Sequence, residues 1–134
     1  MTGPAGLSAA VPALADAAGM TPGLRLLVLF GSRGRGEATD RSDWDLGYLG
    51  TQDLDVSALL GMLVTRLGTD HVDLVDLERA SGLLRYRAAR DGHAVFEASA
   101  GAADRFRLEA ADFWCDAAAV LQRGYEDVLA GLEA

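Results

Sequence analysis

The sequence predicts an α+β (α/β) fold, in which a small β-sheet of about four strands is flanked by helices. Residues 24–30, LRLLVLF, form a nearly continuous apolar run of the kind found in strands buried on both faces. Residues 43–49, DWDLGYL, alternate between polar and apolar side chains, which is typical of a second strand. Apolar side chains recur at helical spacing over residues 56–67 and from residue 102 to the end, so the chain is expected to finish in a long helical segment.

The elements of the N-terminal half can be bounded from local signals. Residues 5–19 are rich in alanine and predict a short helix that ends at Gly19, and residues 21–23, TPG, predict a turn. Asp55 can cap the helix over residues 56–67, because an aspartate side chain accepts a free N–H group of the first helical turn.

Similar signals bound the elements that follow. Residues 71–77, HVDLVDL, predict a third strand, and Ser81 can cap a helix over residues 82–91 that Gly92 stops. Residues 93–97, HAVFE, predict a short fourth strand. No repeat or low-complexity linker divides the chain, so residues 1–134 are expected to form a single domain.

The composition limits the classes of function. A net charge of −8 and a pI near 4.6 argue against a nucleic-acid-binding surface, which is usually basic, and suit carboxylate-bound cations or a basic protein partner. The single cysteine, Cys115, cannot form an internal disulfide, which fits a reducing compartment. The N-terminus lacks the basic region of a signal peptide, and no apolar run approaches the length of a membrane span. We therefore expect a cytoplasmic protein.

The turn after the first strand is a candidate anion-binding element. Gly31 and Ser32 follow the buried strand directly, where the start of a helix would present free backbone N–H groups to an anion. Gly31 lets the backbone approach a ligand closely, and the Ser32 hydroxyl can cap the helix or donate to a phosphate oxygen. Taken alone, such a segment is most often only a turn.

Aspartates on the second and third predicted strands need an explanation, because aspartate is depleted inside strands. Asp43 and Asp45 would point to one face about 6–7 Å apart, a spacing that suits two carboxylates converging on hard cations such as Mg²⁺. Asp73 would add a third carboxylate if its strand pairs beside the second. Asp76, at odd spacing from Asp73, would face the other way. His71 lacks the spacing of a zinc ligand and is not expected to bind metal.

The last helical segment carries two apolar stripes at helical spacing. The first consists of Phe106, Ala110, Phe113, Ala117 and Val120, and the second of Trp114, Ala118, Leu121, Tyr125, Val128 and Leu132. A small sheet can cover one stripe. The second either packs within the monomer or binds a partner protein.

The motif residues resemble a known family. Gly31-Ser32, ten residues and then Asp43-x-Asp45, flanked by strands, is similar to the motif of the nucleotidyltransferase superfamily with a polymerase-β-like palm. The runs SRGRGEATDRSDWDL and VDLVDLERASGLLRYRAARDGHAVFE resemble more narrowly the minimal nucleotidyltransferases, the MNT antitoxins that are paired with HEPN toxins. The resemblance implies a mixed sheet and a catalytic core over residues 24–97. Residues 102–133 share only the family's helical character.

The resemblance also implies roles for the motif residues. Gly31 and Ser32 would hold a nucleoside triphosphate, Asp43 and Asp45 would bind two Mg²⁺ ions, and Asp73 would complete the metal site and deprotonate the attacking hydroxyl. This agrees with two-metal chemistry, in which the ions stabilise both the attacking and the leaving oxygen of an in-line displacement.

Arginines around the turn are candidates for the nucleotide phosphates. Arg33, Arg35 or Arg41 could neutralise charge on the departing phosphates, and Arg33 and Arg41 are taken as the nucleotide-binding pair. Gly34 and Gly36 would make any helix after Ser32 short.

The function that the resemblance implies is transfer of AMP from ATP to a hydroxyl, by expectation a tyrosine, of a cognate HEPN ribonuclease toxin. The chain would form a hetero-oligomer with that toxin and would not contact nucleic acid or membrane directly. Two alternatives stay open. In the first, the chain neutralises its toxin by stoichiometric binding without catalysis. In the second, it transfers a nucleotide to an aminoglycoside-like small molecule.

Overall fold

The computed structural model describes residues 7–39, 41–112 and 123. Along these residues the labelled elements are α1 (Leu7–Gly19), β1 (Leu24–Phe30), α2 (Gly31–Gly34), β2 (Trp44–Gly50), α3 (Val56–Leu67), β3 (Val72–Asp76), α4 (Gly82–Asp91) and β4 (His93–Glu97). A further helix follows β4 and includes residues 102–112; it is named here the 102–112 helix.

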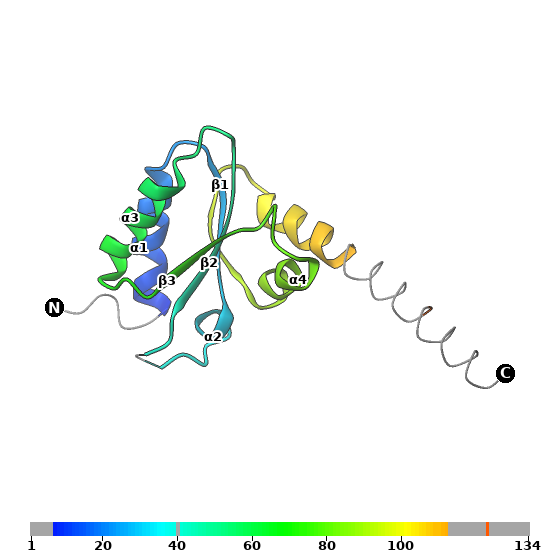
Figure 1. The fold of residues 1–134 in the computed structure, drawn as a ribbon, viewed down its shortest axis with the longest axis horizontal. Coiled ribbons are helices and arrows are strands. Elements are labelled where there is room, and N and C mark those ends of the chain that lie inside the picture. The colour runs from blue at the N-terminus through cyan, green and yellow to red at the C-terminus, as the bar shows by residue number, and fades with distance from the viewer. Residues whose placement is uncertain (1–6, 40, 113–122, 124–134) are drawn as a thin grey trace.

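The four strands form one mixed sheet in the order β3-β2-β1-β4 (Figure 1). Strand β1 is antiparallel to both of its neighbours, β2 and β4, whereas β2 and β3 are parallel. The parallel pair is connected through α3, as parallel neighbours require a crossover. The expected small mixed sheet with flanking helices is therefore confirmed.

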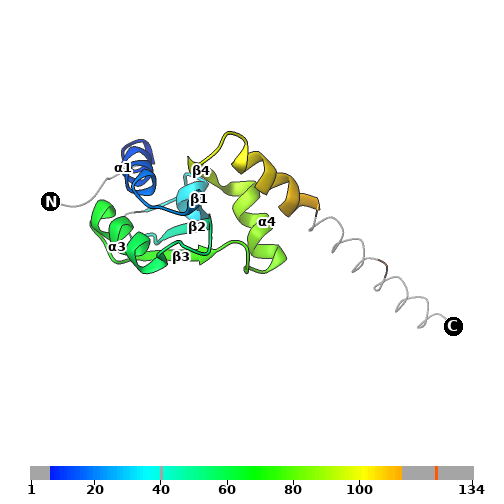
Figure 2. The same cartoon turned by 90° about the horizontal axis from the view of Figure 1, so that it is seen from above.

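Helices cover both faces of the sheet, as Figure 2 shows from above. Helices α1 and α3 pack on one face, where Leu14, Leu59 and Leu63 meet Trp44 and Leu46 in a buried cluster. Helix α4 and the 102–112 helix pack on the other face, around a second cluster of Leu26, Val28, Leu77, Ala88 and Phe106. Strand β1 is buried on both sides because it contributes to both clusters.

Local signals in the sequence set most element boundaries correctly. Strands β1 and β4 and helices α3 and α4 have the expected bounds. The Asp55 carboxylate accepts the N–H of Ala58 at 3.0 Å, and the Ser81 hydroxyl accepts the N–H of Leu84 at 3.2 Å, so both expected caps are confirmed. Helix α1 is described from Leu7 onward.

Strand β2 is shifted by one residue from the expected 43–49, and β3 is one residue shorter at each end than the expected 71–77. The first paired residues of the parallel ladder are Trp44 and Val72, and the Trp44 N–H donates to the carbonyl of His71 at 2.9 Å. Asp43 therefore lies just outside the strand. The difference arises because β3 begins at Val72, so no ladder partner is available for residue 43.

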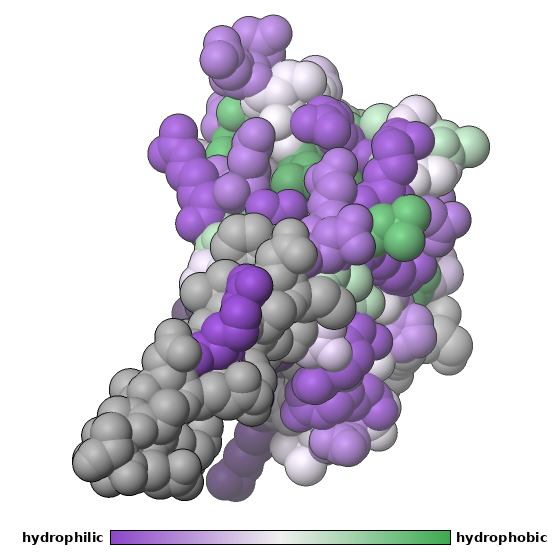
Figure 3. Space-filling model, turned by 90° about the vertical axis from the view of Figure 1, so that its right-hand side faces the viewer, coloured by the Kyte–Doolittle hydropathy of each residue, from purple (hydrophilic) through white to green (hydrophobic). Residues whose placement is uncertain are grey.

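The 102–112 helix confirms the beginning of the first apolar stripe. Phe106 and Ala110 are buried against the second core cluster. Leu108 points elsewhere and remains 66% exposed, and the described part of this side of the molecule is mostly hydrophilic with scattered apolar side chains (Figure 3). The other stripe residues lie outside the described residues, namely Phe113, Trp114, Ala117, Ala118, Val120, Leu121, Tyr125, Val128 and Leu132. Across the part of the chain that the structure describes, no helix is both long and apolar enough to cross a membrane.

Candidate active site

The turn that leaves β1 is built around Gly31. Its φ of +70° lies in the left-handed region, which an L side chain rarely adopts. Helix α2 is only four residues long and ends as the Arg35 N–H donates to the Gly31 carbonyl at 3.1 Å, so the expected shortness of this helix is confirmed. Ser32 is the second residue of α2, and its carbonyl accepts the Glu37 N–H at 2.9 Å.

The sheet brings Asp45 against this turn. Asp45 pairs with Phe30, the last residue of β1, and therefore lies beside Gly31. A Cβ atom added to Gly31 would stand 3.0 Å from Asp45 Cγ and would overlap the carboxylate oxygen. Gly31 thus keeps open the space that the Asp45 carboxylate occupies.

The parallel pairing of β2 and β3 places Asp73 directly opposite Asp45. The condition set by the sequence, that the third strand lies beside the second, is therefore met. Asp76 pairs instead with Tyr48, three residues along the ladder from the Asp45–Asp73 pair. Because this separation is odd, Asp76 lies on the opposite face of the sheet.

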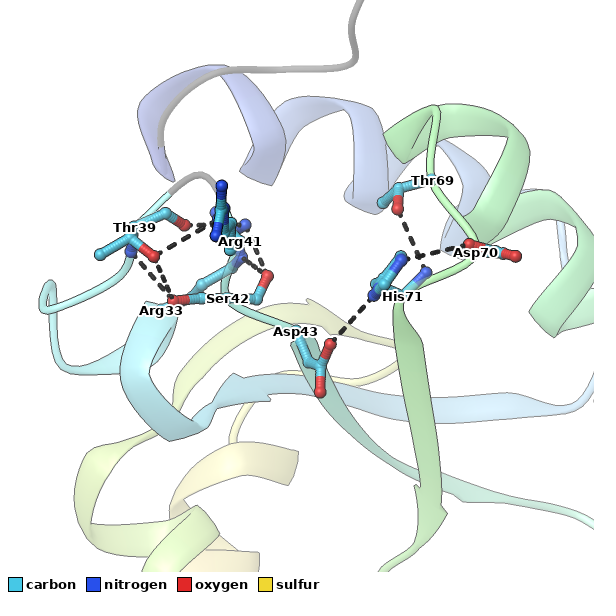
Figure 4. Close-up of polar contacts among 8 residues, drawn as sticks. All are labelled: Arg33, Thr39, Arg41, Ser42, Asp43, Thr69, Asp70 and His71. Atoms are coloured by element: carbon cyan, nitrogen blue, oxygen red, sulfur yellow. Dashed lines mark hydrogen bonds and ion pairs between the residues drawn. The ribbon is translucent and has the colours of Figure 1, made fainter.

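Asp43 lies at the entrance to β2, where its side chain is 57% exposed. Its Oδ1 atom is 3.4 Å from Nδ1 of His71, which also lies 3.7 Å from Asp70 (Figure 4). His71 lies in the loop before β3. The pairing of β2 with β3 brings this residue beside Asp43, and the spacing of residues along the chain does not predict that contact.

These carboxylates repel one another. The pKa of Asp45 is raised by partial burial first and then by the negative charges of Asp73 and Asp43, while Arg35 opposes the effect. A site that concentrates negative charge in this way favours a bound cation.

The donor set fits Mg²⁺ chemically, because its ligands would be carboxylate oxygens beside an open glycine turn. Over the described residues, however, no three acidic, histidine or cysteine side chains are already gathered into a closed ligand cluster. Substrate phosphates would have to complete such a site, as they do in most Mg²⁺ sites of nucleotide enzymes.

The three arginines near the turn have different surroundings. The Arg33 guanidinium stacks on the Trp44 ring, 3.9 Å from its centroid, and donates to backbone carbonyls of the loop before β2. Arg41 lies on that loop, with its N–H donating to the Thr39 hydroxyl and its side chain directed away from Asp43 (Figure 4).

Among these three arginines, Arg35 is the one whose charge lowers the pKa of Asp45. It lies 3.1 Å from Glu37 and 3.7 Å from Asp91 at the end of α4, and its side chain is 42% exposed. Asp91 is held in turn by Arg90 through two bonds of 2.9 Å. From the sequence, Arg35 is one of three candidates but Arg33 and Arg41 are the expected nucleotide-binding pair, because the sequence carries no signal for the position of Arg35.

The family follows from comparison with known proteins. Residues 14–100 match the sequence profile of the family described as "Polymerase beta, Nucleotidyltransferase". The chain belongs to this family. The matched residues include the whole mixed sheet, the Gly31-Ser32 turn and the three aspartates Asp43, Asp45 and Asp73.

Among curated proteins, this nucleotidyltransferase is similar to the protein adenylyltransferase MntA of Aphanizomenon flos-aquae (strain 2012/KM1/D3), with 32% identity over 98 residues. The match covers 64% of this chain and 65% of the MntA chain, slightly less than two thirds of that relative.

Solved structures give longer matches. A toxin–antitoxin crystal structure with AMP-PNP matches with a TM-score of 0.67 and 28% identity, over 90% of this chain and 96% of the other. An MNT antitoxin in complex with a tri-AMPylated HEPN toxin, from Shewanella oneidensis, matches with a TM-score of 0.58 and 29% identity, over 81% and 85% of the two chains. These matches confirm the resemblance to the MNT antitoxins that the motif residues indicate.

Proposed function

We propose that this chain is an antitoxin-type protein adenylyltransferase, which transfers AMP from ATP to a hydroxyl of a cognate HEPN toxin. The observation that carries the proposal is the contact of the Gly31 turn with Asp45, which is paired in turn with Asp73. That arrangement puts a phosphate-binding backbone beside carboxylates, which is what nucleotidyl transfer requires. The named activity of MntA and the AMPylated toxin in the Shewanella complex support the acceptor class.

In this proposal, each element of the site has one task. The Gly31-Ser32 turn binds the triphosphate through backbone N–H groups and the Ser32 hydroxyl. Asp43 and Asp45 hold Mg²⁺, two ions in the full site, and the metal when bound stabilises charge on the transferred phosphoryl group. Arg35 and Arg41 are the arginines assigned to the departing pyrophosphate, and the charge of Arg35 already acts on the pKa of Asp45.

Asp73 accepts the proton of the attacking hydroxyl. The hydroxyl oxygen then forms a bond to the α-phosphorus, and the bond from that phosphorus to the bridging oxygen breaks, so that pyrophosphate leaves with the electron pair. Asp73 suits this role because it faces Asp45 across the parallel ladder and is exposed to an incoming acceptor.

Transfer of radiolabel from [α-³²P]ATP tests the proposal. The reaction is run with Mg²⁺ and with a HEPN toxin, an aminoglycoside or no acceptor, and the Asp43→Asn/Asp45→Asn double variant is the control. We expect label on the toxin alone and none with the double variant. Label on the aminoglycoside would favour small-molecule transfer, and a stable unlabelled complex with the toxin would favour inhibition by binding.

A further inference from the structure

Asp43 is not held by strand pairing on both sides, whereas Asp45 is. Asp45 lies inside the ladder between β1 and β3, whereas Asp43 precedes the first rung of β2. On its C-terminal side the chain is fixed by the bond from the Trp44 N–H to the His71 carbonyl. On its N-terminal side the sheet supplies no rung, so another group has to fix the peptide that joins Ser42 to Asp43.

Arg33 supplies that contact from α2 (Figure 4). Its Nε and Nη2 atoms donate to the Ser42 carbonyl at 3.2 and 2.7 Å, and Nη2 also reaches the Thr39 carbonyl at 3.3 Å. The Ser42 carbonyl belongs to the peptide that leads into Asp43. The same guanidinium stacks on the ring of Trp44, the residue on the other side of Asp43. Arg33 thus contacts the chain immediately before and immediately after this carboxylate.

The loop segment that Arg33 contacts is itself ordered by hydrogen bonds. The Thr39 N–H donates to the Ser42 hydroxyl at 2.9 Å, and the Ser42 N–H donates to the Thr39 carbonyl at 3.1 Å. These two bonds join Thr39 to Ser42, so a contact that holds both residues also holds the chain where it enters Asp43.

We propose that Arg33 is a positioning residue for Asp43, which fixes this carboxylate relative to the Gly31-Ser32 turn. The inference rests on the proposed function, because Asp43 matters only if it binds the metal. It replaces the nucleotide contact expected for Arg33 from the sequence, since the guanidinium already uses its Nε and Nη2 donors on two carbonyls and its face on an aromatic ring. A planar fork can make these contacts together, whereas a lysine ammonium cannot.

Metal affinity measured without substrate tests this role. Tb³⁺ is a hard cation whose luminescence is excited through nearby tryptophan, and Trp44 lies between the two carboxylates. Titration midpoints are compared for wild type, Arg33→Ala, Arg33→Lys, Asp45→Asn and Arg79→Ala. The last variant removes the same charge from a side chain that is 89% exposed beyond the end of β3. Midpoints are used because altered contact with Trp44 changes the amplitude of the signal.

We expect Arg33→Ala to weaken Tb³⁺ binding by about 10- to 100-fold, as loss of an outer contact to a metal ligand does. Arg33→Lys should fall between wild type and Arg33→Ala, and Arg79→Ala should match wild type. If Arg33→Ala does not fold by circular dichroism, Arg33→Lys carries the test, with a weakened midpoint at an unchanged KM for ATP as the expected result.

Two results would overturn the inference in distinguishable ways. In the first, wild type shows Asp45-dependent Tb³⁺ binding, both Arg33 variants retain it in full, and the variants have a raised KM for ATP. That result would make Arg33 a phosphate ligand and would not contradict the proposed function. Wild-type protein without Asp45-dependent Tb³⁺ binding would overturn the metal site itself, and the role of Arg33 with it.

Discussion

Gly31→Ala is the substitution that separates the geometry of the site from the stability of the fold. Gly31 has φ +70°, and Gly36, five residues on, has φ +75°. An alanine at either position occupies the left-handed region, which costs about 1–2 kcal/mol. The two sites differ in their surroundings, because a Cβ at Gly36 meets nothing within 4 Å, whereas a Cβ at Gly31 collides with the Asp45 carboxylate.

The magnitudes follow from this difference. Both variants should lose about 1–2 kcal/mol of unfolding free energy, which corresponds to a fall in Tm of roughly 3–10 °C for a domain of this size. Only Gly31→Ala has to displace the carboxylate or the turn, by on the order of 1 Å, and a misplacement of that size costs about 100-fold in rate. Gly31→Ala should therefore lose about 100-fold in kcat relative to Gly36→Ala.

Thermal unfolding followed by circular dichroism gives the stability of each variant, and label transfer from ATP at saturating Mg²⁺ gives the rate. The comparison with Gly36→Ala removes the part of the effect that comes from backbone strain alone. A Gly31→Ala protein that transfers AMP within a few-fold of Gly36→Ala would refute the contact between the turn and Asp45 as a feature of the active site.

Other expected outcomes concern the charges and the core. The folded-state pKa of Asp45 is raised by burial and by its acidic neighbours, so the unfolding free energy of the metal-free protein should fall as the pH rises through that pKa. Asp45→Asn should flatten this slope and raise Tm at neutral pH in EDTA; an unchanged slope would mean that Asp45 is not destabilised by its surroundings. Arg35→Ala should raise the KM for ATP and raise the pKa of Asp45 further, because a cation that opposes its protonation is lost; a KM equal to that of wild type would exclude Arg35 from phosphate binding. Gly47→Ala should cost about 1–3 kcal/mol in chemical denaturation, since its Cβ would lie 2.7–2.8 Å from side-chain carbons of the fully buried Leu77. A loss below about 0.5 kcal/mol would contradict that packing.

Signals confined to one element made most of the fold readable from sequence. The helix caps at Asp55 and Ser81 depend only on residues within one helical turn, and the apolar run of β1 lies within a single strand. Their positions can therefore be predicted from the local sequence. The first residue of β2 could not be predicted, because it depends on where β3 begins and therefore on the pairing of the two strands in the tertiary structure.

The positions of the site aspartates could be predicted from the alternation of residues along a strand, whereas the contacts of the site arginines could not, because these depend on side-chain direction. The pairing of Asp45 with Asp73 follows once β3 lies beside β2, and the exclusion of Asp76 follows from strand parity. The arginines differ, since their directions depend on the four-residue length of α2. For that reason the sequence could not distinguish Arg33, which contacts Trp44, from Arg35, which acts on Asp45.

The central claim is that this chain transfers AMP to a HEPN toxin and that the transfer requires Asp43 and Asp45. The intact mass of that toxin tests this claim most directly. The toxin is incubated with this protein, ATP and Mg²⁺, with the Asp43→Asn/Asp45→Asn variant as the matched control. We expect a gain of one or more AMP units with the wild-type protein and no change with the variant. An unchanged toxin mass in a stable complex with the wild-type protein would contradict the claim, and so would an equal gain with the double variant.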